Sequence, residues 1–174
     1  MPAKESRSVG ELDTNKFVKQ NFSISDYTNK VAKRNGKKII VPIEGKDISS
    51  FLPLEQKSYV YFWNPVCVGT LPDIHKFDSL SKVGKNVIIV SLRKDYATID
   101  KALHKTSLAQ YPYYVIEDEK YTRGLLVRKI MFCKDACPSC YKQYRDDLAI
   151  ADYLLIENGT IKPVLYNEGS IIRN

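Results

Sequence analysis

Two apolar segments joined by one amphipathic helix constrain this chain more than any other feature. Residues 59–63 form an aromatic and β-branched run of strand length, and residues 86–92 form a second apolar run. Between the two runs, apolar side chains recur at helical spacing: Leu71, Ile74, Phe77 and Leu80. Two buried strands connected by a helix predict a parallel strand-helix-strand unit, because parallel neighbours require a long crossover.

Further elements are predicted on both sides of this unit. Residues 38–43 and 113–116 have the pattern of short strands, and residues 95–108 suit a helix with Asp95 as its N-cap. The Asn-Gly pair at 158–159 separates two apolar runs and supplies the positive φ angles of a tight hairpin turn. The pattern therefore predicts a mixed α/β domain that ends in an antiparallel hairpin.

The length of 174 residues fits one domain with a real core. We divide the chain into a polar N-terminal lead-in, residues 1–37, and one domain, residues 38–174. The lead-in carries a predicted helix over residues 25–34 and a turn signal at Asn-Gly 35–36. The domain carries a cysteine-bearing insertion at about residues 120–150, in which the pattern predicts a short polar helix over residues 141–148 and assigns no clear element before it.

Charge and apolar length argue against two kinds of partner. The formal net charge is +7, but the basic residues are dispersed and no nucleic-acid-binding module accompanies them. The apolar stretches are far shorter than the roughly 20 residues that a membrane-spanning helix needs. We therefore expect no nucleic acid and no membrane span. The polar start fits either a native cytosolic terminus or a chain from which an export signal or lipid anchor has been removed.

Three short motifs carry a resemblance to a known family. Residues 61–67 (YFWNPVC) contain a strand that ends in Phe-Trp and a cysteine soon after it, residues 156–159 (IENG) form a hairpin turn, and residues 38–46 form a strand and turn. Together they resemble the thioredoxin-like superfamily, most closely the TlpA- and ResA-like thiol-disulfide oxidoreductases, over roughly residues 38–170. The resemblance implies a thioredoxin-like three-layer α/β sandwich with a mixed central sheet flanked by helices.

The resemblance also implies an activity and a site. It implies thiol-disulfide exchange with protein or peptide thiols and disulfides, no cofactor, and an extracytoplasmic location, periplasmic or membrane-anchored. Cys67 matches the nucleophile at the start of the helix, where backbone N–H groups stabilise a thiolate. Trp63 and Pro65 beside it would bind substrate, as would Ala151, which stands where the family has its cis-proline.

Two departures from the family pattern keep other functions open. The family motif is Cys-x-x-Cys, whereas Thr70 stands three residues after Cys67; its hydroxyl can hydrogen-bond a thiolate but cannot resolve a mixed disulfide. Ala151 in place of the cis-proline is the second departure. The alternatives are a non-catalytic binding or accessory module of the same fold and, because residues 65–67 (PVC) resemble part of the peroxiredoxin motif, a one-cysteine peroxidase.

The other three cysteines are clustered as Cys133, Cys137 and Cys140. One interpretation is a redox-active pair of Cys137 and Cys140, which would form its own couple or resolve Cys67. A second is a site for a metal or cluster held by thiolates. A third is a structural disulfide within the insertion, with the remaining cysteine reduced or paired with Cys67. Spacing alone leaves all three open, and our expectation is that no metal is bound.

Overall fold

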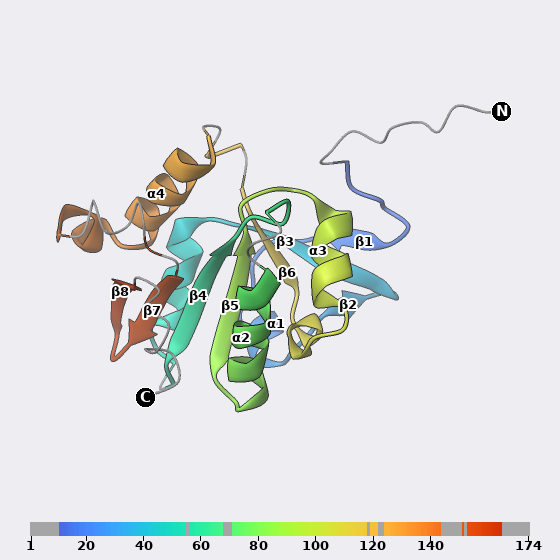
Figure 1. The fold of residues 1–174 in the computed structure, drawn as a ribbon, viewed down its shortest axis with the longest axis horizontal. Helices are drawn as coiled ribbons and strands as arrows, with labels where there is room; N and C mark the ends of the chain where they lie inside the picture. Colours follow the sequence, from blue (N-terminus) through green and yellow to red (C-terminus); the bar gives the residue numbers. More distant parts are fainter. Residues whose placement is uncertain are drawn as a thin grey trace.

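A computed structural model describes residues 11–54, 56–67, 71–117, 119–121, 124–143, 151 and 153–164. Its centre is a mixed eight-stranded sheet with helices on both faces (Figure 1). The strands are β1 (Phe17–Lys19), β2 (Lys33–Arg34), β3 (Lys37–Ile43), β4 (Ser58–Trp63), β5 (Asn86–Ser91), β6 (Tyr113–Ile116), β7 (Tyr153–Glu157) and β8 (Thr160–Val164). The described chain is therefore of the mixed α/β class.

The strand order is β1-β3-β6-β5-β4-β7-β8, with β2 paired to β3. Neighbours from β1 to β4 are parallel, whereas β7 joins β4 and β8 joins β7 in antiparallel fashion. The predicted parallel unit is confirmed as β4 and β5, which are connected by α2 (Leu71–Lys82). The predicted C-terminal hairpin is confirmed as β7 and β8, with Asn158 and Gly159 at φ values of 51° and 69°.

The helices form two layers. α2 and α3 (Tyr96–Leu103) pack on one face, where they contribute Phe77 and Ile99 to a buried cluster that also contains Trp63. The 3-10 helix η1 (Gly45–Phe51) and α4 (Leu125–Ala136) pack on the other face. Other helices among the described residues are α1 (Ile24–Thr28) and the short 3-10 helix η3 (Ser107–Gln110), and residues 138–143 are helical as well. The arrangement is compatible with a three-layer sandwich.

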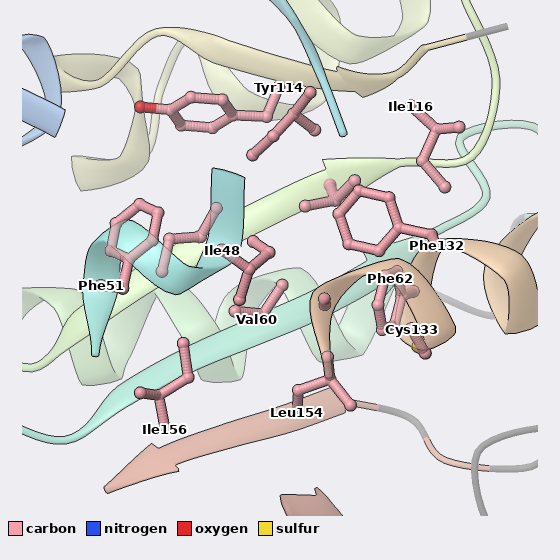
Figure 2. Packing of buried hydrophobic residues seen from close by; sticks show 14 of the residues in the cluster. Ile48, Phe51, Val60, Phe62, Tyr114, Ile116, Phe132, Cys133, Leu154 and Ile156 are labelled. Atoms are coloured by element: carbon pink, nitrogen blue, oxygen red, sulfur yellow. The ribbon is translucent and has the colours of Figure 1, made fainter. Parts of the chain in front are cut away.

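β4 is buried along its whole length because both faces of the sheet are covered. Val60 and Phe62 point to the η1 and α4 side, whereas Tyr59, Tyr61 and Trp63 point to the α2 and α3 side. This alternation follows from the two-residue period of a strand. Figure 2 shows the first side, where Phe132 of α4 lies against Phe62. The sequence-based prediction of a central, buried strand is confirmed.

The described part of the lead-in belongs to the same core. β1 pairs with β3, and Tyr27 of α1 is only 2% exposed. The Tyr27 ring stacks on Tyr111 with centroids 4.7 Å apart, and its hydroxyl donates a hydrogen bond to the Val87 carbonyl. The helix predicted over residues 25–34 is wrong beyond Thr28, because the chain turns there and Lys33–Arg34 forms β2, an antiparallel partner of β3.

Gly45 lies where η1 meets α4 at close range. A side-chain carbon at this position would collide with the Phe132 carbonyl and would come within 2.6 Å of the Ala136 nitrogen. Its φ is not positive, so the requirement for glycine comes from proximity and not from backbone conformation. The absence of a side chain therefore lets η1 and α4 share one layer.

A polar cluster holds the same junction on its solvent side. The Lys120 ammonium lies 2.7 Å from a carboxylate oxygen of Glu44 and 2.7 Å from one of Asp135. Asp135 also accepts a hydrogen bond from the Tyr121 hydroxyl at 2.6 Å, and that hydroxyl accepts one from the Gly45 N–H at 3.0 Å. These contacts hold the pKa values of Glu44 and Asp135 below their ordinary values. The cluster thereby connects η1, residues 119–121 and α4.

Lys38 on β3 is a buried cation with backbone partners. Its ammonium donates hydrogen bonds to the carbonyls of Ala109 at 2.6 Å and Tyr111 at 2.7 Å, and it lies 4.0 Å from the centre of the Tyr113 ring. Burial lowers the pKa of Lys38 to about 8. The folded state therefore gives up this proton at a lower pH than the unfolded chain does.

We expect this shift to appear as a pH dependence of stability. Between about pH 8 and the ordinary lysine pKa near 10.5, the unfolded chain binds more protons than the folded one, so the free energy of unfolding rises with pH. The test is urea unfolding of the wild type and of Lys38→Met at about pH 7 and about pH 9.5. The wild type should gain stability relative to the variant; a constant difference would contradict the assignment. Cys133 and the buried tyrosines are present in both proteins, so their contributions to the pH dependence cancel in the difference between the two free energies of unfolding.

Candidate functional site

The candidate site lies at the edge of the sheet where β4 and β5 end. The register pairs Trp63 with Ser91, so both parallel strands finish at the same level, and the Leu92 N–H donates to the Trp63 carbonyl at 2.7 Å. Because β7 is antiparallel to β4, its beginning lies at this edge too, with Tyr153 opposite Tyr61. Ligands of open α/β sheets commonly bind at the carboxyl ends of the parallel strands.

Cys67 lies in the turn that leaves this edge. Its N–H donates to the Asn64 carbonyl at 3.0 Å, which closes the turn directly after β4. Pro65 is buried within the turn, whereas Val66 and Cys67 are exposed. Cys67 keeps its thiol, because it belongs to no disulfide. The turn thus presents a sulfur to solvent at the end of a strand that is itself fixed by two neighbours.

The sequence analysis assigned Thr70, Trp63, Pro65 and Ala151 to the site around this thiol. Thr70 lies outside the described residues, and α2 is described from Leu71 onward. Trp63 and Ala151 are each 1% exposed. The side chains of Trp63, Pro65 and Ala151 therefore pack inward, and no peptide bond among the described residues is cis. A substrate at this edge would meet backbone and the sulfur rather than these side chains.

Two basic residues of α4 contribute to the edge, and the sequence analysis did not find them. The Arg128 guanidinium donates to the Leu92 carbonyl at 3.1 Å, and the Lys129 ammonium donates to the Ala151 carbonyl at 2.7 Å. Leu92 follows β5 and Ala151 precedes β7, the two strands that flank β4. The cations therefore lie on both sides of the strand that leads to Cys67. Positive charge at this edge favours anionic partners.

We expect the double change Arg128→Gln and Lys129→Met to slow the reaction of Cys67 with oxidised glutathione, a disulfide of net negative charge, by about threefold, because two cations that attract the anion to this edge are removed. The measurement is the rate of glutathione adduct formation on Cys67 at low and at high ionic strength. The matched control is Lys134→Met, since this lysine of the same helix is exposed and lies over the Tyr141 ring. An equal effect of the control would show that Arg128 and Lys129 have no special influence.

The three clustered cysteines separate into a pair and a buried thiol. Cys137 and Cys140 form a disulfide with their Cα atoms 5.2 Å apart. Cys133 on α4 is 1% exposed, and burial raises its pKa to about 12. Within the described part of the chain, no group of three or more His, Cys, Asp or Glu side chains is arranged to hold a metal ion.

The disulfide is remote from Cys67. The Cys140 sulfur lies 3.0 Å from the Ile161 carbonyl of β8, and Ile161 pairs with Ile156, which in turn pairs with Ser58 at the start of β4. Trp63, the other end of β4, lies five residues beyond Ser58, which at roughly 3.3 Å per residue is about 16 Å, and Cys67 follows Trp63 by four residues. Disulfide formation requires Cα atoms within about 7 Å. The structure therefore does not bring Cys67 and Cys140 together, although the sequence analysis allowed the pair to resolve Cys67.

Comparison with known proteins finds no family model that matches this chain, and no curated protein or solved structure that matches it. Among the described residues, no helix combines the length and the apolar character needed to cross a membrane. The molecule is thus defined by its own geometry: a mixed α/β sheet with an exposed thiol at the edge where its central strand ends.

Proposed function

We propose that this protein has a thioredoxin-like fold and carries out thiol-disulfide exchange with Cys67 as its nucleophile. The exposure of Cys67 in the turn directly after the central strand β4 is the observation that supports the proposal most. The antiparallel β7 and β8 hairpin beside β4 and the basic residues Arg128 and Lys129 at the same edge add to it. The proposed partners are protein or peptide disulfides.

The chemistry follows from one thiol whose motif contains no second cysteine. The Cys67 thiolate attacks one sulfur of a substrate disulfide, forms a mixed disulfide and expels the other substrate sulfur as a thiolate, which takes up a proton. An external thiol then attacks the mixed disulfide and releases Cys67. Thr70 has no sulfur, Cys140 is remote and Cys133 is only 1% exposed, so the proposal assigns the second step to an external thiol.

One observation favours a second candidate, the non-catalytic binding or accessory module. In the family that the sequence resembles, the residue at the position of Ala151 presents its backbone to substrate. Here the Ala151 carbonyl accepts a hydrogen bond from Lys129 instead, and the residue is buried. A module of this kind would bind its partner without forming a bond to Cys67. No comparable observation favours the one-cysteine peroxidase.

The two candidates differ in covalent capture. We expect oxidised glutathione, added to protein with its Cys137–Cys140 disulfide intact, to form a mixed disulfide on Cys67 faster than on a cysteine-containing peptide. Mass spectrometry after acid quenching locates the adduct. Capture on Cys67 at a rate no higher than that of the peptide would favour the binding module and would remove the enzyme proposal.

A further inference from the structure

We propose that Cys137 and Cys140 form a second redox couple, independent of Cys67, in which Cys137 exchanges with external dithiols and disulfides and Cys140 is the resolving sulfur. This inference goes beyond the proposed function of Cys67 and does not rest on it. The two centres are separated by about the length of β4, as the strand pairing from Ser58 to Ile161 requires.

The two sulfurs of the disulfide differ in access. Cys140 is 8% exposed and belongs to the buried cluster on the α4 side of the sheet. Cys137 is partly exposed, and Pro138 and Ser139 beside it are exposed. A thiolate that approaches from solvent therefore reaches the Cys137 sulfur first, and access decides which sulfur of a disulfide is attacked.

The hydrogen bonds around the disulfide also favour Cys137 as the reactive sulfur. The Cys140 N–H donates to the Cys137 sulfur at 3.2 Å, and the Ser139 hydroxyl lies 3.4 Å from that sulfur. Because a disulfide sulfur has no proton, the hydroxyl is the donor in this second contact. Both donors would remain beside Cys137 after reduction, where they stabilise a thiolate. Cys137 is therefore arranged as the nucleophile of the reduced pair.

Cys140 has the opposite environment. Its sulfur lies 3.0 Å from the Ile161 carbonyl, an acceptor that a reduced Cys140 thiol can satisfy by donating its proton. The contact would keep Cys140 protonated and close to Cys137 in the dithiol form. Cys133, one helical turn before Cys137, takes no part, because it is sealed within the core.

The exchange balances with an external dithiol as the reductant. One thiolate of the dithiol attacks the Cys137 sulfur, a bond forms between them, and the bond to Cys140 breaks; Cys140 leaves as a thiolate and takes up a proton. The second thiolate of the dithiol then attacks the dithiol sulfur that is bonded to Cys137 and releases Cys137 as a thiolate, which takes up a proton. The dithiol is oxidised to a disulfide by two electrons, and both cysteines are reduced. In the reverse direction, the Cys137 thiolate attacks a substrate disulfide and Cys140 resolves the adduct.

The test uses the full chain with Cys67→Ser, so that failure of the Cys67 proposal cannot affect it. Reduction with dithiothreitol, followed by N-ethylmaleimide and mass spectrometry, should show Cys137 and Cys140 labelled together and Cys133 unlabelled. In rapid-quench samples taken during reoxidation with oxidised glutathione, the glutathione adduct should be on Cys137. An adduct that forms first on Cys140 would overturn the proposal. So would a disulfide that, in the folded protein, resists a dithiothreitol concentration sufficient to reduce it in the unfolded protein.

Two variants sharpen the assignment of roles. In Cys140→Ala, the glutathione adduct on Cys137 should accumulate, because no resolving sulfur remains. In Cys137→Ala, glutathionylation of Cys140 should be at least about tenfold slower than that of Cys137 in the first variant, since Cys140 is shielded. Equal rates in the two variants would contradict the assignment of Cys137 as the reactive sulfur and Cys140 as the resolving one. The rapid-quench experiment on the parent protein decides the question if either variant fails to fold.

Discussion

Replacing Gly45 with alanine is expected to lower the free energy of unfolding by about 3 kcal/mol, the upper end of the cost of overpacking a core. The added carbon would collide with the Phe132 carbonyl and come within 2.8 Å of the Asp135 side chain. Both obstacles belong to α4, and the first is backbone, so relief requires the helix to move away from η1. Urea unfolding monitored by circular dichroism measures the change.

The matched control for this prediction is Gly124→Ala. Gly124 precedes α4 with φ of −55°, and nothing lies within 4 Å of the position that a side-chain carbon would occupy. Its replacement should cost less than about 1 kcal/mol, because only the N-cap preference is lost. If both substitutions shift the unfolding midpoint equally, the close approach of η1 and α4 is not a determinant of stability.

Replacing Cys67 with serine is expected to reduce capture of oxidised glutathione by protein with its disulfide intact by at least about a hundredfold, because a serine hydroxyl is not ionised at neutral pH and forms no disulfide. The remaining thiol, Cys133, is buried and has a pKa raised to about 12. The residual rate in the variant should therefore be close to zero.

Cys133→Ala provides the control for the Cys67 prediction. The substitution removes the only other thiol that the intact disulfide leaves, and it should leave the rate of capture at Cys67 within about twofold of the wild type. Circular dichroism of both variants checks that the fold is retained. A large loss in Cys133→Ala with little loss in Cys67→Ser would assign the reactive sulfur to α4 and refute the proposal.

The central part of the sheet could be predicted from sequence because its signals are local. β4 and β5 are uninterrupted apolar runs, and they flank a helix with three- and four-residue apolar spacing. Asp95 caps α3 through its side chain, as its position before the apolar pattern predicts. These elements required no knowledge of distant contacts.

The elements that were not predicted depend on long-range contacts. β1 is only three residues long, and it is a strand because β3 lies beside it. Residues 124–136 mix apolar and basic side chains without a clean period, because α4 buries Phe132 and Cys133 while Leu126 and Met131 stay exposed. Local pattern cannot distinguish such a helix from an irregular insertion.

The candidate site was predicted in part. The position of Cys67 after a central strand followed from the apolar run before it. The positions of Arg128 and Lys129 beside β5 and β7 did not, because α4 reaches that edge only through tertiary packing. The separation of Cys67 from Cys140 likewise follows from strand pairing that spacing does not encode.

The most direct test of the account compares Cys67 with itself in the folded and unfolded chain. With the Cys137–Cys140 disulfide intact, iodoacetamide labelling at neutral pH is followed by mass spectrometry in buffer and in concentrated urea. We predict that Cys67 is alkylated in the folded protein at least as fast as in urea, whereas Cys133 is alkylated only in urea, because the turn after β4 exposes the first sulfur and the core covers the second. Clear protection of Cys67 in the folded protein would contradict the assignment of Cys67 as the nucleophile.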